Sequence, residues 1–410
     1  MSALRLAAAS LALVAFSDVR SQALVPPPMV PSREVDLTAP IDPFPPALAW
    51  QRAFGNANGG CVLGIGGERL VAIPVAIDGT PGAQVVAPLP PGSTRAHGFA
   101  AVLAGTGRLH VALGVDDPAG GRRLAALHSD DCGGTWSPAV TLNASDTPGG
   151  SSFQSSFRLV AIDADGQGRA AIAWLPYTSP RVVVSTSADG GATWTAPVES
   201  IDDVPGDTSF ANLGLDVAID PASGAVVVAS ADLAPGYPLG AVVRTSRSTD
   251  GGRTFSDPAL VPGTPTPSAE PDAAFPDLAV LPDGSIALVF SESDGSVAGT
   301  GIAQLRTTDG GAGWTRGPRL PFGASGDANY WQIDPAVVRE GDQALVYWPG
   351  SSGLAVARWD GAASAFVGAQ TLTPFVFRPA WIQGFASLAR AANGTWALAY
   401  LASGQPQETR

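Results

Sequence analysis

The chain has 410 residues and a formal charge of −13, and all 23 of its strongly basic residues are arginines. The acidic balance argues against nucleic-acid binding, which selects basic faces, and the lack of lysine excludes Schiff-base and P-loop lysine chemistry. With 49 glycines, 37 prolines and only 14% charged residues, the composition is typical of many short strands joined by turns.

The N-terminus is predicted to be a secretory signal peptide over residues 1–23. Arg5 supplies positive charge, the apolar stretch Leu6–Phe16 follows, and cleavage is expected after Ser17 or Ala23. The stretch is too short to cross a bilayer as a helix. We therefore expect a secreted protein, extracellular or periplasmic, with no membrane span. Residues 24–50 are proline-rich and are expected to form an irregular or extended leader.

The chain has two cysteines, Cys61 and Cys132, which are too few for a metal site without histidine. Disulfides persist in oxidising compartments, so an exported chain is expected to bond the two. Two separate buried thiols are the alternative. No cofactor is expected, although acidic loops such as Asp202-Asp203 contain the oxygen ligands that calcium prefers.

Four similar stretches recur along the chain: Ser129–Trp136, Ser187–Trp194, Ser248–Phe255 and Thr307–Trp314. Their aspartates, Asp131, Asp189, Asp250 and Asp309, are 58, 61 and 59 residues apart. A near-constant period of this length indicates one structural unit copied several times. We expect each stretch to be a turn in which the aspartate accepts backbone N–H groups, glycines supply positive φ, and the aromatic residue packs as an apolar plug.

A second hairpin signal lies upstream of each aspartate turn. Its six tips are Gly105–Gly107, Asp165-Gly166, Ser223-Gly224, Asp283-Gly284, Glu340-Gly341 and Asn393-Gly394. Two weaker aspartate turns stand at Asp78-Gly79 and Asp360-Gly361. One unit is therefore four strands in about 60 residues, the pattern of a β-propeller blade.

The fold expected is all-β, a six-bladed β-propeller of four-stranded antiparallel blades, with seven blades as the alternative. Residues 51–410 would form this single domain. The first unit, residues 70–89, and the last unit, residues 385–401, each supply two strands. We expect these two segments to share one blade, because a blade made from both chain ends would close the ring and remove exposed strand edges.

The pattern Ser-x-Asp-x-Gly-x-Thr-Trp is similar to the Asp-box of bacterial neuraminidase (BNR) repeats. Residues 129–136 and 187–194 match it fully, Phe255 replaces the tryptophan in the third copy, and Thr307 and Gly313 depart from it in the fourth. From about residue 50 onward the chain thus resembles the sialidase-like propeller superfamily. The resemblance implies that Asp131, Asp189, Asp250 and Asp309 are structural and lie away from the substrate face.

Sialidases remove terminal sialic acid from glycans, and the resemblance implies an arginine triad, a tyrosine nucleophile with a glutamate base, and an aspartate acid. The usual Arg-Ile-Pro motif is absent, since Glu34 follows Arg33 and Leu70 follows Arg69. This departure favours a propeller that binds a glycan or an extracellular protein without catalysis. An exo-sialidase-type glycoside hydrolase is the alternative. The protein is expected to be a monomer.

Blade topology places the glycine turns and the Asp-boxes on one face, and the longer 2–3 and 4–1 loops on the other, here called the loop face. The catalytic candidates there are Tyr330 as nucleophile, Glu270 as its base and Asp272 as acid. The substrate-binding candidates are Arg95, Arg158, Arg378, Trp331 and Trp381. The loop face also carries His97, Asp116 and the pair Arg122-Arg123, which is interpreted as a solvated loop.

Overall fold

The computed structural model describes residues 10–17, 30–36, 51–56, 59–66, 68–76, 80–143, 160–176, 181–202, 212–233, 241–263, 272–293, 301–321, 335–340, 342–350, 353–372, 386–390 and 396–402. Regular structure in these segments is β-strand throughout. None of them belongs to a helix long and apolar enough to cross a membrane.

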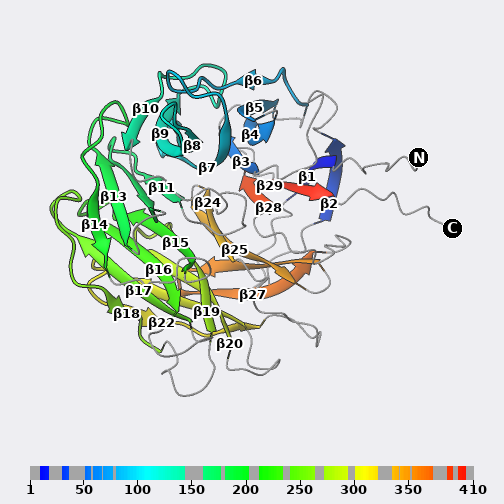
Figure 1. Ribbon diagram of the computed structural model, residues 1–410. Coiled ribbons are helices and arrows are strands. Elements are labelled where there is room, and N and C mark those ends of the chain that lie inside the picture. The colour runs from blue at the N-terminus through cyan, green and yellow to red at the C-terminus, as the bar shows by residue number, and fades with distance from the viewer. Residues whose placement is uncertain are drawn as a thin grey trace, which may run out of the picture.

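The described strands form seven antiparallel sheets built on four strands each, and six of these sheets use strands that are consecutive in the chain (Figure 1). The first three are β3 (Gln51–Asn56), β4 (Gly59–Gly66), β5 (Arg69–Ala76) and β6 (Val85–Val86); β7 (Ala96–Leu103), β8 (Leu109–Asp116), β9 (Arg122–Ser129) and β10 (Val140–Asn143); and β11 (Val160–Ala164), β12 (Ala170–Trp174), β13 (Val182–Ser187) and β14 (Val198–Ile201).

The next three are β15 (Asn212–Ile219), β16 (Val226–Leu233), β17 (Ala241–Ser248) and β18 (Ala259–Leu260); β19 (Asp272–Val280), β20 (Ile286–Ser293), β21 (Gly301–Thr307) and β22 (Thr315–Arg316), with β23 (Leu320–Pro321) also on β21; and β24 (Ala336–Glu340), β25 (Gln343–Gly350), β26 (Gly353–Asp360) and β27 (Ala365–Leu372). The seventh sheet joins both chain ends in the order β2 (Val30–Asp36), β1 (Ser10–Ser17), β29 (Trp396–Ala402) and β28 (Ala386–Arg390).

The sheets follow one another around a ring. The first strand of each consecutive sheet contacts the first strand of the next, from β3 through β7, β11, β15, β19 and β24. From β24 the contacts continue to β28, and β28 contacts β3. Four-stranded antiparallel sheets arranged in this way are the blades of a β-propeller.

Two expectations about the ring are wrong. The described residues form seven sheets rather than six, and residues 70–89 do not pair with residues 385–401. Residues 69–86 instead supply the outer strands of the sheet that begins with β3, whereas β29 pairs with β1. Part of the expected signal peptide, Ser10–Ser17, forms β1, and part of the expected leader, Val30–Asp36, forms β2, so strands before residue 51 belong to the seventh sheet. Signal-peptide cleavage and export stay predictions.

The hydrophobic core lies between neighbouring blades. Ala112 and Leu124 of one sheet pack with Ile172 and Trp174 of the next, and similar clusters join four other pairs of adjacent sheets. Successive side chains of a strand point to opposite faces, so a blade covered on both faces needs apolar residues at nearly every position. This explains why Leu109–Val115 is buried throughout.

The Asp-box turns confirm the hydrogen-bond chemistry expected of them. Asp189 accepts from the Ser187 hydroxyl (2.8 Å), from the Thr193 N–H (2.9 Å) and from the Thr193 hydroxyl (2.5 Å). These bonds, the Thr193 hydroxyl first, lower the pKa of Asp189 to about 2. The Ser187 oxygen in turn accepts from the Gly191 N–H at 2.9 Å. Each of these side chains thus has a structural role inside the turn.

The fourth Asp-box shows which departures from the pattern matter. Thr307 replaces serine with the same bonds, since its hydroxyl donates to Asp309 (2.7 Å) and accepts from the Gly311 N–H (3.0 Å). Gly313 keeps the backbone bond to Asp309 (2.9 Å) but has no hydroxyl to add a second. Asp309 therefore accepts one hydrogen bond fewer than Asp189.

This difference gives a stability prediction. We expect Asp189→Ala to lower the free energy of unfolding by about 2 kcal/mol, because three partly solvated hydrogen bonds are lost. Asp309→Ala should lower it by about 1 kcal/mol less, since only two such bonds are lost. Urea denaturation of the two variants beside the wild type measures the difference. Equal losses would contradict a role for the threonine hydroxyl.

Each Asp-box also packs against the preceding blade. The second glycine of the box has φ +86° at Gly191 and φ +85° at Gly252. A Cβ on Gly252 would lie 2.5 Å from the Thr186 methyl group of the preceding sheet. The box aromatic residues enter the same seam, Trp194 against the cluster that holds Ala112 and Phe255 against the one that holds Val184. Two constraints thus require glycine at the second position of the box: the positive φ angle, and the close approach of the preceding blade.

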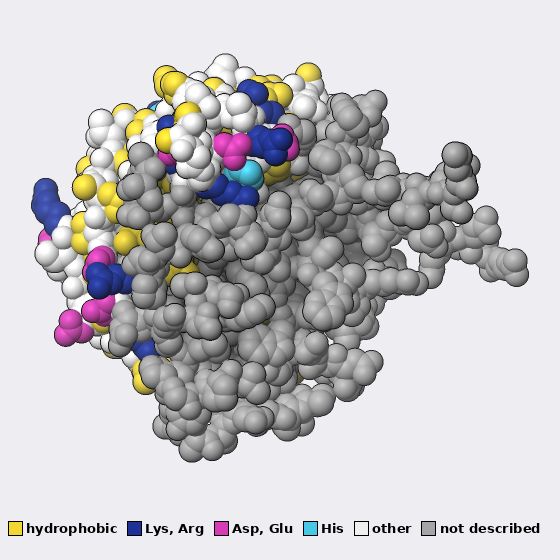
Figure 2. All heavy atoms as spheres, in the orientation of Figure 1, with side chains coloured by type: hydrophobic (Ala, Val, Ile, Leu, Met, Phe, Trp, Pro, Cys, Tyr) yellow, Lys and Arg dark blue, Asp and Glu magenta, His cyan; other side chains and the backbone are white. Residues whose placement is uncertain are grey.

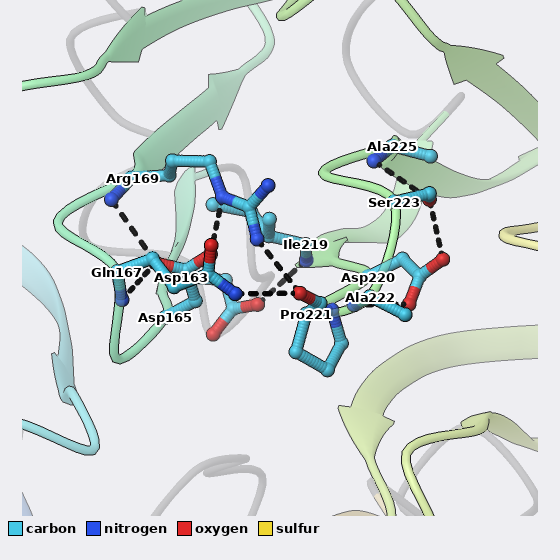
Figure 3. A network of polar contacts seen from close by, with 10 residues as sticks. All are labelled: Asp163, Asp165, Gln167, Arg169, Ile219, Asp220, Pro221, Ala222, Ser223 and Ala225. Atoms are coloured by element: carbon cyan, nitrogen blue, oxygen red, sulfur yellow. Dashed lines mark hydrogen bonds and ion pairs between the residues drawn. The ribbon is translucent and has the colours of Figure 1, made fainter.

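Carboxylates that are buried or partly buried join the innermost strands. Asp163 accepts from the Ile219 N–H (2.7 Å), and in the next seams Asp216 accepts from Leu278 (2.6 Å) and Asp277 from Val337 (2.9 Å). The inner edge of a first strand has N–H groups that no neighbouring strand pairs, and these carboxylates satisfy some of them. Figure 3 shows the Asp163 bond beside the Pro221 carbonyl, which accepts from Gln167 and Arg169.

The two cysteines form a disulfide between blades. Cys61 lies on β4, and Cys132 lies in the Asp-box turn that follows β9, with Cα atoms 5.8 Å apart. Both side chains are buried in the seam between these two sheets. The expectation of a bonded pair is confirmed, and the bond links segments 71 residues apart.

Candidate functional site

Most of the candidates for a sialidase-type centre lie outside the described residues. These are Tyr330, Glu270, Arg158, Arg378, Trp331 and Trp381. Asp272 begins β19, where its backbone pairs with Ser293. Their roles therefore stay predictions.

Arg95 is the described member of the expected arginine group. Its Nε lies 3.0 Å from Oε2 of Glu68, in the turn between β4 and β5 of the preceding blade. Both side chains are more than half exposed, at 56% and 52%. An exposed pair of this kind contributes little to stability. Arg95 is thus already paired across a blade seam, on the loop face.

His97 and Asp116 are joined by a short side-chain contact on the loop face. Nε2 of His97 lies 2.5 Å from Oδ1 of Asp116, and the two side chains are 15% and 31% exposed. The register of β7 against β8 shifts between Ala96 and Gly98, so His97 is the extra residue of a β-bulge. A bulge redirects the side chain it inserts. It breaks the strand alternation and brings His97 to the end of β8.

Asp116 is held on several sides. The Ser93 hydroxyl donates to its carbonyl oxygen (2.6 Å), its own N–H donates to the Arg95 carbonyl (3.1 Å), and the Thr94 hydroxyl reaches its second carboxylate oxygen at 3.4 Å. Arg123 fixes Ser93 in turn, because its Nη2 donates to the Ser93 hydroxyl at 2.9 Å. These hydrogen bonds therefore fix the backbone of Asp116 and hold its carboxylate in place against His97.

Arg122 completes a row across three strands. It stands directly opposite Asp116 in the ladder between β8 and β9. Its Nη1 is buried and has no hydrogen-bond partner among the described residues. Partial burial lowers the pKa of the Arg122 guanidinium, and Asp116 opposes that shift. The interpretation of Arg122-Arg123 as a solvated loop is wrong, because both residues begin β9 and are partly buried.

We call His97, Asp116 and Arg122 the polar row. The row lies at the start of β7, the end of β8 and the start of β9, on the face opposite the Asp-boxes. Figure 2 shows basic, acidic and histidine side chains gathered above this part of the ring. Within the described segments no group of three or more His, Cys, Asp or Glu side chains could hold a metal ion. The chemistry that the row offers is proton transfer and hydrogen bonding to a polar ligand.

Sequence reasoning named each member of the polar row but did not connect them. No sequence signal marks the bulge at His97, because the strand Ala96–Leu103 shows no regular alternation that the extra residue would interrupt. The Asp-box aspartates, by contrast, lie where they were expected, in turns at the opposite face, with their oxygens bonded within the turn.

No protein-family model and no curated protein matches the chain. Similar solved structures include a PL25 ulvan lyase with bound -[GlcA(1-4)Rha3S]-, at 12% identity and a TM-score of 0.49, covering 84% of this chain and 88% of that one. NanB sialidase from Streptococcus pneumoniae has 11% identity and a TM-score of 0.46, with 96% and 94% covered.

A third similar structure is the GH93 alpha-L-arabinofuranosidase of Fusarium graminearum with arabinobiose, at 12% identity and a TM-score of 0.48, covering 76% of this chain and 95% of that one. At these values the likenesses assign no activity to this chain. The propeller architecture follows instead from the chain's own sheets and the contacts between them.

Proposed function

We propose that the protein is an exported, monomeric seven-bladed propeller that binds a glycan on its loop face, at the polar row. The observation that supports the proposal is the Arg122 guanidinium, whose Nη1 is buried without a partner among the described residues. A buried donor left unpaired carries a desolvation penalty that a ligand oxygen would remove. The fixed His97–Asp116 pair beside it offers further polar contacts.

The location and the binding mode have separate support. The bonded cysteines favour an oxidising compartment. Loops gathered on one face of a rigid ring are where binding residues usually lie. The binding role without sialidase chemistry is favoured over hydrolysis, because the Arg-Ile-Pro motif is absent and Arg95 is engaged by Glu68.

The proposal is tested by a glycan array followed by calorimetry on the glycans that bind. We expect Arg122→Gln to weaken binding by at least about 10-fold, the loss expected for one hydrogen bond from a charged donor. Arg181→Gln is the matched control, because Arg181 pairs with Glu199 on the outer strands of another blade. An array without any bound glycan, or equal affinities for the two variants, would sink the proposal.

The hydrolase alternative has its own test. A fluorogenic sialoside is incubated with the wild type and with Tyr330→Phe. Under the proposal neither protein releases the fluorophore. Release by the wild type that the substitution abolishes would favour the exo-sialidase instead.

A further inference from the structure

His97 has the geometry of an oriented proton acceptor. An ionised carboxylate can only accept hydrogen bonds, so Nε2 of His97 must be the donor in its 2.5 Å contact with Asp116. That bond fixes the tautomer and leaves Nδ1 as the basic nitrogen. Among the described residues His97 makes no other hydrogen bond. A base held by a carboxylate, beside a guanidinium with one unsatisfied N–H group, is an arrangement for chemistry as well as for binding.

The composition of the polar row selects the class of reaction. Hydrolysis by paired carboxyl groups needs a second carboxyl facing the first, whereas the one carboxylate of the row is already bonded to His97. A neutral imidazole can remove a proton from carbon only where that carbon is acidified. The carbon next to a sugar carboxylate is acidified in this way once a cation neutralises the carboxylate, and Arg122 supplies such a cation.

We propose that His97 is the proton-transfer residue of a β-elimination that cleaves a uronate-containing glycan bound at the polar row. The inference rests on the proposed glycan binding and adds a reaction to it. Asp116 is a positioning residue, since it holds the imidazole without touching the glycan. Arg122 binds the uronate carboxylate.

The reaction balances without a co-reactant. Nδ1 of His97 takes the proton from the carbon next to the carboxylate, and the electron pair of that C–H bond forms a carbon–carbon double bond. The adjacent glycosidic C–O bond breaks, and its electrons leave with the oxygen. The imidazolium then returns the proton to that oxygen. The products are an unsaturated uronate and a free hydroxyl end, and His97 is restored.

The test uses the full chain with polygalacturonate, alginate and hyaluronan as probes and dextran as the neutral control. Elimination is followed by the ultraviolet absorbance of the conjugated double bond and by product masses. We expect His97→Gln to lower kcat by at least about 100-fold, the lower range for loss of a general base, while affinity stays within about threefold. Arg181→Gln should keep the wild-type rate.

Asp116→Asn separates positioning from folding. It should lower kcat with little change in KM and shift the pH–rate profile, which a purely structural residue would not do. A thermal melt confirms that each variant is folded, and His97→Asn replaces His97→Gln if that variant unfolds.

The outcomes distinguish the two proposals. Binding of a probe without a double bond overturns the elimination and leaves the glycan-binding proposal intact. Products without a double bond identify hydrolysis and overturn it too, as does an unimpaired His97→Gln. If the glycan array is also negative, both proposals fail.

Discussion

Reduction of the Cys61–Cys132 disulfide is expected to lower the free energy of unfolding by about 4 kcal/mol. The bond closes a loop across a sequence separation of 71, and the chain-entropy model gives about this value for a loop of that length. Because the bond ties the sheet that begins with β3 to the next sheet, its loss should loosen the ring beside the sheet that joins the chain ends. Urea unfolding with and without reductant measures the effect.

The choice of variant at position 132 sharpens the test. Cys132 has φ +55 where the other Asp-boxes place Gly190, Gly251 and Gly310, all at positive φ. A side chain in this region is strained by about 1 kcal/mol or more. We therefore expect Cys132→Gly to be less destabilised than Cys132→Ala by about 1 kcal/mol, although both lose the disulfide. Mass spectrometry of the reduced wild type confirms that both thiols are free. If its urea midpoint is then unchanged, the predicted effect of the disulfide is contradicted.

The turns of the repeat could be predicted because their chemistry is local. Asp165-Gly166 joins β11 to β12, and the Asp189 box joins β13 to β14, as their residue types indicate. The second glycine of each box is explained only in part by sequence, because its contact with the preceding blade, such as Gly252 against Thr186, depends on how blades pack.

The blade count could not be predicted because the missed strands lack a clear local signal. Gln51–Asn56 mixes polar and apolar residues without alternation, although the dipeptide Asn58-Gly59 is a hairpin signal in the sequence. Ser10–Ser17 has an apolar pattern that a signal peptide shares, and its partner β29 lies at the other end of the chain. The pairing of the two chain ends depends on how the ring closes. Local sequence patterns carry no information about it.

The candidate site was hidden for a related reason. His97 and Asp116 are 19 residues apart, and the bulge that brings them together depends on the register of two strands. The family resemblance implied arginines and a tyrosine at the site, and neither the resemblance nor the residue types implied a histidine. The structure instead joins a histidine, a carboxylate and Arg122, whose individual positions carry no obvious signature.

Acid is expected to destabilise the protein through His110, with an opposing effect from Asp163. Burial first, then His128 and Arg108, lower the pKa of His110 to about 4. Its ring lies against Gly191 of the next blade, beside His128, with ring centroids 6.1 Å apart. Asp130 is the acidic group that favours protonation. Below its ordinary pKa of 6.5 the unfolded state takes up a proton that the folded state refuses until about pH 4.

Stability from His110 is thus present above pH 6.5 and lost as the pH falls toward 4, by about 3 kcal/mol in full. The lowered pKa of His128 acts in the same direction. Asp163 acts in the other. Burial raises its pKa to about 6, so the folded state binds a proton between pH 6 and 3.8 that the unfolded state does not. Stability therefore rises over that interval as the pH falls.

Variants separate the two effects, which partly cancel in the wild type. Asp163→Asn keeps an acceptor for the Ile219 N–H but removes the compensating proton, so its stability should fall steeply between pH 6.5 and 4.5. His110→Gln should show the reverse, with about 2–3 kcal/mol less acid loss than the wild type. Urea unfolding at pH 7 and at pH 4.5 measures both. Superimposed pH curves for the wild type and His110→Gln would show that the seam between these blades does not respond to protonation of His110.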